Sequence, residues 1–207
     1  MMLARVSAVE VRWLPLSAEN EPRVVVDTLV LPAVERDFCV DARTEVTGLS
    51  VDDLLARGVP AREARRAFQA ALRPDTVLVG HAVDHDLLAL GLRWTGSVID
   101  TSLLFAVEWN PDATHGLRHL CETVLRAATE RDARGGAHDS VEDALLALRL
   151  VDRLLRRDYA FPIELPRGRT RLAKSTATGA AAQIAFSKVE AARVAARAAF
   201  ERAPSLR

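Results

Sequence analysis

A short apolar run followed at once by a helical pattern constrains the fold of this chain more than any other feature. The run covers residues 75–80 (DTVLVG), and the helical pattern covers 82–93. A short, almost fully apolar strand is typical of one buried on both faces of an α/β sheet. A second short strand is expected at 96–100 (GSVID). The two predict a sheet flanked by helices, with functional residues beyond the carboxyl ends of its parallel strands.

The segments around these strands predict a β-hairpin and further helices. Two β-rich runs, 3–14 and 23–31, are joined by the polar turn SAENEP and predict an antiparallel hairpin. Ser50 with Asp53 resembles a capping box that opens a short helix. Other helical patterns cover 61–73, a stretch near 101–107, 115–127 and a segment from about 140 to 157. This order predicts a mixed β-sheet flanked by helices.

Composition bounds the class of protein. The 207 residues suffice for one domain with a sizeable core and an appendage. No apolar run approaches the roughly 20 residues that span a bilayer, and the N-terminus lacks the layout of a signal peptide. Cys39 and Cys121 lie far apart and show no CxxC spacing, which argues against a disulfide framework or a zinc site. We therefore expect an intracellular protein without a membrane partner.

Charged residues are unevenly distributed along the chain, although the net charge is zero. Residues 167–207 carry a balance of +7, and residues 1–166 a balance of −7. The basic segment includes Arg167, Arg169 and Arg171, which we assign as candidate contacts to a nucleic-acid backbone; a nuclear address is another interpretation. The alternative is a solvated Ala-rich helix over roughly 180–202 with a basic lead-in. Two units are expected, 1–160 and a linker with the C-terminal helix over 161–207.

Several acidic residues occupy places where chemistry and helix capping are both reasonable. Asp86 lies in the first turn of the helix after the first buried strand, and Asp100 ends the second strand. Asp143 follows Ser140 by three positions, which predicts a capping box at the start of the last helix. His138 precedes this helix by two residues. Each acid alone is explained as a helix cap or as a partner of the helix dipole, so only their combination indicates a site.

That combination resembles a known family. The motifs LVGHAVDHDLLAL, DTS, GLRHLCETVL and HDSVEDALLALRLV occur in the order and spacing of the Rex-type RNA exonucleases, members of the DnaQ-like (DEDDh) superfamily of 3′–5′ exonucleases. The upstream segments VDARTEVTGLSVDDL and LARVSAVEV…RVVVDTLVLP also resemble this family. The resemblance covers roughly 3–157 and implies a ribonuclease H-like mixed sheet. A plain α/β domain whose acids are all helix caps is the alternative.

The resemblance implies roles for individual residues. Asp86 and Asp143 match catalytic metal aspartates, and His138 matches the general-base histidine. Two Mg²⁺ or Mn²⁺ ions about 4 Å apart would hold the attacking water and the leaving 3′ oxygen. A histidine with a pKa near 6.5 can take the proton of the water at neutral pH. His81 and Asp100 are expected to contact the nucleic acid, and the product is expected to be a nucleoside 5′-monophosphate.

The first motif of the family, an Asp-x-Glu on a central first strand, is not found ahead of residue 10. Reading SAVEV as this motif, with Ala8 in place of the aspartate and Glu10 retained, is rejected because 3–14 matches the second strand of the family. On this interpretation a strand is missing from the middle of the sheet, and buried N–H and C=O groups would be left unpaired at a cost of about 1–3 kcal/mol each. We therefore expect an upstream segment or a partner chain to supply it, and a weak, incomplete two-metal site without it.

Two functions remain open from the sequence. One is a metal-dependent 3′–5′ exoribonuclease that acts on single-stranded RNA 3′ ends. The other is a degenerate exonuclease-like domain that binds RNA or acts as a scaffold in a ribonucleoprotein or ribosome-assembly particle. The resemblance favours RNA processing in the nucleus or nucleolus and leaves an organellar role open. The oligomeric state is not predicted.

Overall fold

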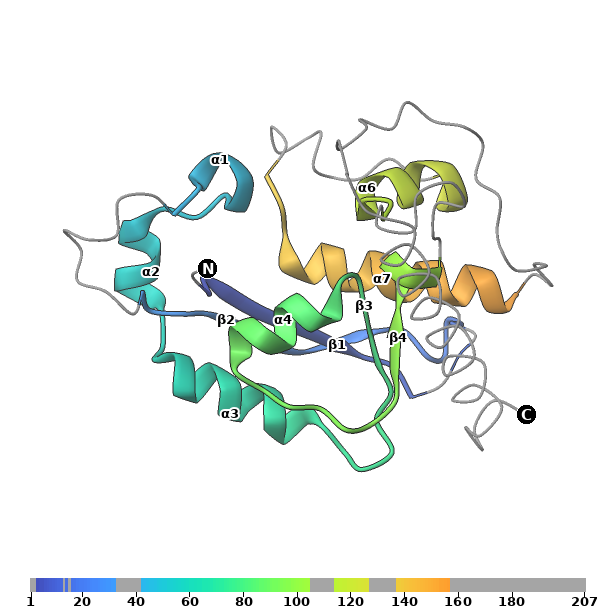
Figure 1. Ribbon diagram of the computed structural model, residues 1–207, viewed down its shortest axis with the longest axis horizontal. Helices are drawn as coiled ribbons and strands as arrows, with labels where there is room; N and C mark the ends of the chain where they lie inside the picture. The colour runs from blue at the N-terminus through green and yellow to red at the C-terminus, as the bar shows by residue number, and fades with distance from the viewer. Residues whose placement is uncertain are drawn as a thin grey trace, which may run out of the picture.

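The computed structural model describes residues 3–12, 14, 16–32, 42–104, 114–126 and 137–156 (Figure 1). Cys39, the basic segment with Arg167, Arg169 and Arg171, the expected Ala-rich helix and the boundary near residue 160 lie outside these ranges. Within them, no helix combines the length and apolar character that crossing a membrane requires.

Two strands come first along the described chain, and helices lie before, between and after the two strands that follow. The strands are β1 (Arg5–Glu10), β2 (Arg23–Leu29), β3 (Leu78–Gly80) and β4 (Val98–Asp100). The helices are α1 (Thr44–Thr47), α2 (Val51–Arg57), α3 (Ala61–Ala71), α4 (Val83–Leu90), α5 (Thr101–Leu104), α6 (Leu117–Leu120), the π-helical turn η2 (Cys121–Leu125) and α7 (Ser140–Leu155).

The strands form two separate two-stranded sheets. β1 pairs antiparallel with β2, which confirms the predicted hairpin, and its register shifts at a bulge between Ala8 and Val9. β3 pairs in parallel with β4, with Val79 opposite Ile99. No ladder joins the two sheets among the described residues. The outer edge of β2 is partly covered, since Val59 bonds with the backbone of residues 29 and 31.

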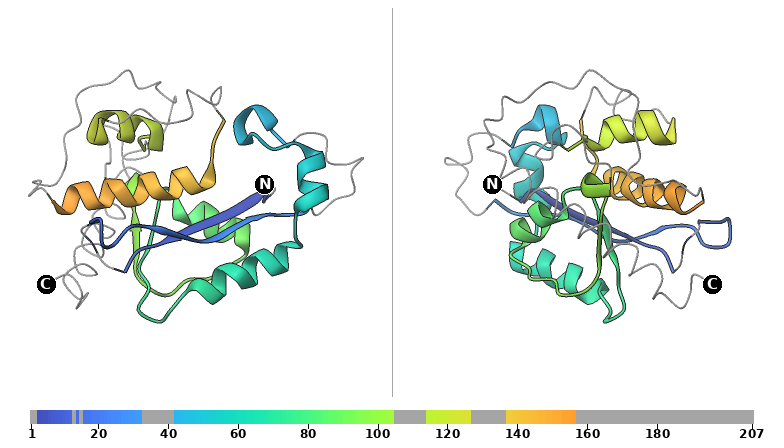
Figure 2. Two further views of the ribbon diagram at one scale, coloured as in Figure 1. Left: turned by 180° about the vertical axis from the view of Figure 1, so that it is seen from behind. Right: turned by 45° about the vertical axis from the view of Figure 1, so that its right-hand side comes forward.

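Helices lie on both sides of the strands. Figure 2 (right) shows α7 on one side and α3 and α4 on the other. α7 contacts both β1 and β3, and thus bridges the two sheets. Its buried residues, among them Leu150 and Leu154, pack with Leu120 and Cys121 of α6 and η2. A second cluster joins the hairpin to α3 and α4; its buried members are Val6, Val26, Val30, Ala64 and Leu90.

Local signals set several element boundaries. The predicted capping box of α2 is confirmed, because Ser50 accepts from Asp53 N–H and the Asp53 side chain accepts from Ser50 N–H. β3 is shorter than the predicted 75–80 strand. A turn in which Thr76 N–H donates to the carbonyl oxygen of Arg73 and Thr76 Oγ1 accepts from Arg73 N–H occupies its beginning.

Candidate active site

His138 and Asp143 lie in contact at the start of α7. The Nδ1 atom of His138 is 3.2 Å from Oδ2 of Asp143. The histidine side chain is 46% exposed and the aspartate side chain 27%, so solvent reaches both. The two residues that the sequence assigned to one site are therefore neighbours, and their catalytic roles stay predictions.

The N-cap of α7 is Asp139, so the sequence prediction that Ser140 caps this helix is wrong. Oδ1 of Asp139 accepts hydrogen bonds from two backbone N–H groups of the first turn, at 2.9 and 3.1 Å. The Ser140 hydroxyl instead lies 2.5 Å from the hydroxyl of Ser7 on β1. Because Asp139 satisfies these first N–H groups, the carboxylate of Asp143 is not required as a cap and faces His138.

Arg5 on β1 anchors this helix start. Its guanidinium donates to Asp139 at 2.9 Å and to both carboxylate oxygens of Asp27 on β2, at 2.7 and 2.9 Å. The hydrogen bond from Arg5 holds the pKa of Asp27 below its ordinary value. Sequence reasoning missed this contact, because Arg5 and Asp139 are separated by 134 positions and neither residue carries a local signal for the other.

The loop that carries His138 rests on α1. The backbone N–H of His138 donates to the carbonyl oxygen of Val46 at 2.7 Å. Gly48 ends α1 at φ 68°, in the left-handed region that favours glycine. A Cβ atom at this glycine would lie 3.3 Å from Cβ of Ala137. Helix α1 therefore packs closely against the histidine loop and restricts its position.

Asp86 lies in the first turn of α4, just beyond the carboxyl end of β3. Solvent still reaches its side chain, but the surrounding residues remove part of the hydration of the carboxylate. This burial, with the charge of Asp100 and more weakly those of Asp84 and Asp143, raises the pKa of Asp86 to about 6. The fold thus brings Asp86 into the electrostatic environment of Asp143, as the sequence analysis expected for a shared site.

Asp100 accepts hydrogen bonds from residues at the starts of α4 and α5. Its Oδ1 accepts from the backbone N–H groups of Ala82 and Ser102 and from the Ser102 hydroxyl, and its Oδ2 accepts from the backbone N–H of Val83. Ala82, with φ 59°, contributes no side-chain cap to α4, so Asp100 satisfies the N–H groups at that end. These bonds position the helix that carries Asp86. Contact between Asp100 and nucleic acid stays a prediction.

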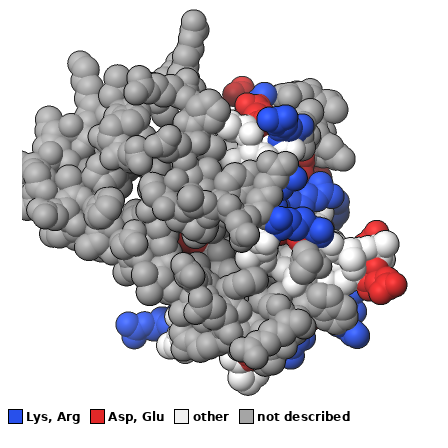
Figure 3. Space-filling model, turned by 90° about the vertical axis from the view of Figure 1, so that its right-hand side faces the viewer, with Lys and Arg blue, Asp and Glu red and all other residues white. Residues whose placement is uncertain are grey.

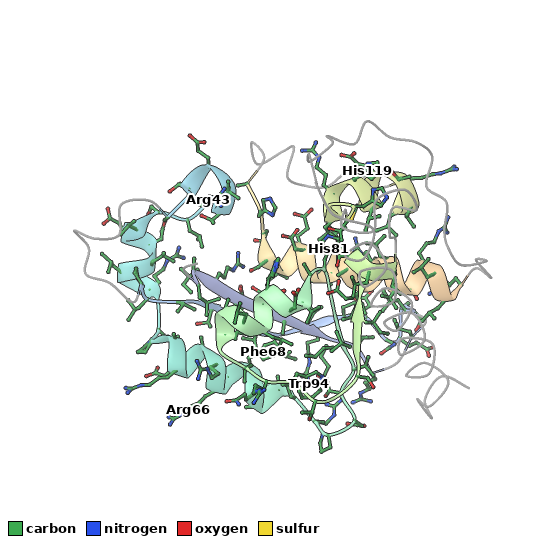
Figure 4. The ribbon with its side chains drawn as sticks, in the orientation of Figure 1. Arg43, Arg66, Phe68, His81, Trp94 and His119 are labelled. Carbon is green, nitrogen blue, oxygen red and sulfur yellow. The ribbon has the colours of Figure 1, made fainter. Side chains whose placement is uncertain are left out.

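His81 connects the ends of β3 and α5. Its Nδ1 is 3.0 Å from Oγ1 of Thr101, and this hydroxyl donates to the carbonyl oxygen of Gly80 at 2.8 Å. Because the single hydroxyl proton goes to Gly80, Nδ1 of His81 is the donor in its contact with Thr101. Burial lowers the pKa of His81, which keeps the ring neutral at pH 7. Figure 4 shows His81 at the end of β3 and His119 on α6; a nucleic-acid contact by His81 stays a prediction.

The described residues fit a divalent cation only in part. Asp86 and Asp143 offer the carboxylate oxygens that Mg²⁺ prefers, whereas the oxygens of Asp100 are engaged with backbone and hydroxyl donors. Over the described part of the chain, no group of three or more His, Cys, Asp or Glu is arranged to hold a metal ion. Two carboxylates are too few for a two-metal site, so further acidic residues are needed to complete it.

Curated relatives identify the family. RNA exonuclease 1 homolog of Homo sapiens is 33% identical over 140 residues, which are 68% of this chain and 11% of that protein. The chain contains a domain of the RNA exonuclease type. Small RNA degrading nuclease 3 of Arabidopsis thaliana is 31% identical over 136 residues, 65% of this chain and 17% of that protein. RNA exonuclease 4 of Candida glabrata is 34% identical over 139 residues, 66% of this chain and 49% of that protein.

The chain spans about half or less of each of these relatives, and no family model matches it. The resemblance to the Rex-type RNA exonucleases is confirmed.

Solved structures agree on the fold. The Pan2 catalytic unit of Neurospora crassa superposes with a TM-score of 0.50 at 20% identity, over 73% of this chain and 27% of that one. The Pan2 module of Saccharomyces cerevisiae, solved with AAGGAA RNA, gives a TM-score of 0.50 at 21% identity, over 74% of this chain and 28% of that one. These likenesses confirm an α/β nuclease fold.

Proposed function

We propose that this RNA exonuclease domain degrades single-stranded RNA from its 3′ end with divalent cations and releases nucleoside 5′-monophosphates. The contact of His138 with Asp143 beside Asp86 is the observation that carries this proposal. An acceptor of protons and two carboxylates at the carboxyl end of a parallel strand are the groups that such a hydrolysis requires. Family membership supports RNA as the substrate class.

His138 has the role of general base in this proposal. The carboxylate of Asp143 fixes the orientation of the ring through Nδ1, which leaves Nε2 as the atom that accepts a proton from water. The side chain is exposed enough for a water molecule and the end of an RNA strand to reach it. Helix α1 and the Asp139 cap keep the histidine loop at the start of α7.

Asp86 and Asp143 would hold Mg²⁺ or Mn²⁺ together with carboxylates from outside the described residues. A bound divalent ion supplies a more acidic water and stabilises negative charge on phosphate oxygens. The raised pKa of Asp86 reflects first the loss of hydration around its carboxylate and then the neighbouring carboxylates, and a bound cation would stabilise its ionised form. His81, Asp100, Arg167, Arg169 and Arg171 are the proposed contacts to RNA.

A second candidate function is a degenerate domain that binds RNA or serves as a scaffold in a ribonucleoprotein. The lack of a metal-holding group of three within the described ranges favours it. Among the described residues in Figure 3, basic and acidic side chains lie next to one another. For either function we propose an intracellular role, in the nucleus or nucleolus, within the unit 1–160.

Degradation of end-labelled RNA under single-turnover conditions tests the two functions. With Mg²⁺ or Mn²⁺, we expect 5′-labelled single-stranded RNA to shorten in steps of one nucleotide and 3′-labelled RNA to release a labelled mononucleotide first. Asp143→Asn should slow both by at least about 100-fold. Internal cuts, or equal degradation by the variant, would refute the exonuclease proposal. RNA that is bound but not shortened with either metal would establish the second function instead.

A further inference from the structure

Two histidine rings stack on one another at the start of α6. The ring centroids of His115 and His119 are 5.1 Å apart, and the two ring planes meet at 26°. His115 precedes α6, and His119 lies within that helix. Both residues are half-buried, so the pair is neither enclosed in the core nor fully in solvent. Stacking at this separation is an arrangement that aromatic rings prefer, and each ring keeps a second face.

The turn that carries the pair is anchored in the core. Leu120 and Cys121, which follow His119 directly, are fully buried and lie in one cluster with Leu146 and Leu150 of α7. Because these side chains fix the backbone of α6, the ring of His119 has only its own side-chain torsions to lose when a ligand contacts it. A ring held in this way binds at a smaller entropic cost than a ring on a loop that must first be ordered.

The backbone between the two rings borders open space. Among the described residues, a Cβ atom at Gly116 would meet no heavy atom within 4 Å beyond its chain neighbours and its own helix. Gly116 has φ −65°, which any residue adopts, so neither backbone strain nor a close neighbour requires a glycine here. The described structure thus leaves room for a ligand next to the pair on this side.

His81 links the pair to the candidate active site. Burial lowers the pKa of His81, whereas the charges of Asp100 and Asp143 and a hydrogen bond with the backbone of His115 act in the opposite direction. The imidazole of His81 therefore contacts the segment that carries the pair and also senses the charge of Asp143. Figure 4 shows His119 on α6 and His81 at the end of β3. The stacked pair thus lies beside the candidate active site.

We propose that the stacked pair of His115 and His119 binds a nucleobase near the 3′ end of single-stranded RNA. Histidine is one of the side chains on which the splayed bases of single strands stack, and every base offers a π-face, so the site tolerates any sequence. Burial and the neighbouring His119 lower the pKa of His115, so its ring is neutral at pH 7 and binds through its face rather than through charge. The proposal rests on the proposed function for its ligand, an RNA strand whose 3′ end lies at Asp143.

A cycle of protein and RNA variants tests the stack in the full chain. The probe is a single-stranded RNA with a 5′ fluorescein, and its match has abasic sites at the 3′-terminal nucleotides. Fluorescence anisotropy in Ca²⁺ instead of Mg²⁺ measures both Kd values, with the RNA length checked on a gel. Joint His115→Leu and His119→Leu should weaken intact RNA by at least about 5-fold, the loss of one stacked base. Abasic RNA should lose less than about 2-fold, and an equal loss on both RNAs would overturn the proposal.

Two further variants separate the loss of a ring face from other effects. His119→Phe keeps a flat aromatic face without ring nitrogens, so its Kd for intact RNA should stay within about 3-fold of the natural chain. Trp94→Leu is the matched control, because Trp94 is an aromatic residue that lies far from His119 (Figure 4), and both Kd values should be unchanged. A loss with either variant as large as that of the double leucine variant would overturn the proposal.

Rates in Mg²⁺ separate this proposal from the proposed function. The double leucine variant should need at least about 5-fold more RNA for half-maximal degradation and keep its maximal single-turnover rate within about 3-fold, because the rings bind a base and not the reacting phosphate. An unchanged half-maximal concentration would overturn the stack alone. The expected cycle in Ca²⁺ without degradation in Mg²⁺ would support the stack and count only against the proposed function.

A measurement on the natural chain covers the case in which the double leucine variant fails to fold. Intact RNA should shift the NMR signals of the ring protons of His119 upfield, because a stacked base shields them, and abasic RNA should shift them much less. Equal shifts with the two RNAs, or none, would overturn the proposal.

Discussion

At the scale of single residues, Asp86 and Asp143 experience different surroundings. Asp143 faces a histidine ring at 3.2 Å, whereas Asp86 lies near the carboxylates of Asp100, Asp84 and Asp143. Neighbouring negative charges and partial burial both disfavour the ionised form of Asp86. A bound cation would therefore stabilise the ionised carboxylate of Asp86 more than that of Asp143.

This difference predicts a pH-dependent effect of Asp86→Asn on stability. The pKa of Asp86 is about 6 in the folded protein and about 3.9 in an unfolded chain, so Asp86 lowers the free energy of unfolding progressively as pH rises through this window. Because solvent reaches the side chain, we expect Asp86→Asn to stabilise the metal-free protein by only about 1 kcal/mol at pH 8. The gain should be roughly half as large at pH 5. Urea denaturation at both pH values measures it, and an equal gain at both would contradict the assignment.

His138→Gln separates catalysis from structure. Glutamine keeps polar contacts but cannot accept a proton from water, so the single-turnover rate of RNA degradation should fall by about 100-fold or more. The free energy of unfolding should change by less than about 0.5 kcal/mol, since the side chain is half-exposed. His85→Gln is the matched control, because His85 is 70% exposed on α4 and has no assigned role. Equal losses of rate in the two variants would refute His138 as the base.

At the scale of elements, the hairpin holds the start of α7. Arg5 and Ser7 on β1 contact Asp139 and Ser140, which are the N-cap and first residue of that helix. His138 and Asp143 lie on either side of this cap. Displacement of the helix start would therefore change the distance between base and carboxylate.

Asp139→Ala should remove the cap and the anchor together. We expect a loss of about 1–2 kcal/mol in the free energy of unfolding, because two helix N–H groups lose their acceptor and Arg5 loses one partner. Arg57→Met is the control: its pair with Asp53 on α2 is exposed, and its loss should cost less than about 0.5 kcal/mol. Urea denaturation compares the two, and a cost for Asp139→Ala no larger than that of the control would contradict the anchoring role.

At the scale of the whole molecule, an apolar cleft between β1 and β3 leaves the two sheets held mainly by α7, which contacts both strands.

The sequence predicted the elements well where their signals are local. Alternating and apolar runs predicted the hairpin and the parallel strands, and the Ser50 capping box was correct to the residue. The start of α7 was predicted with the wrong cap, because Ser140 and Asp139 are both good capping residues and only the contact of Ser140 with Ser7 distinguishes them. Glu10, which the sequence analysis did not assign to the site, forms ion pairs with Arg23 and Arg73.

The sequence by itself determined where most strands and helices lie, because periodicity and capping are properties of neighbouring residues. The family resemblance led to the prediction that His138, Asp143 and Asp86 share a site, and the structure brings the first two into contact. Only the tertiary structure decided what depends on contacts between distant residues. Arg5 meets Asp139 across 134 positions, burial raises the pKa of Asp86, and two sheets face each other across an apolar cleft. Strand edges, desolvation and long-range ion pairs arise when the chain is packed, and no local pattern encodes them.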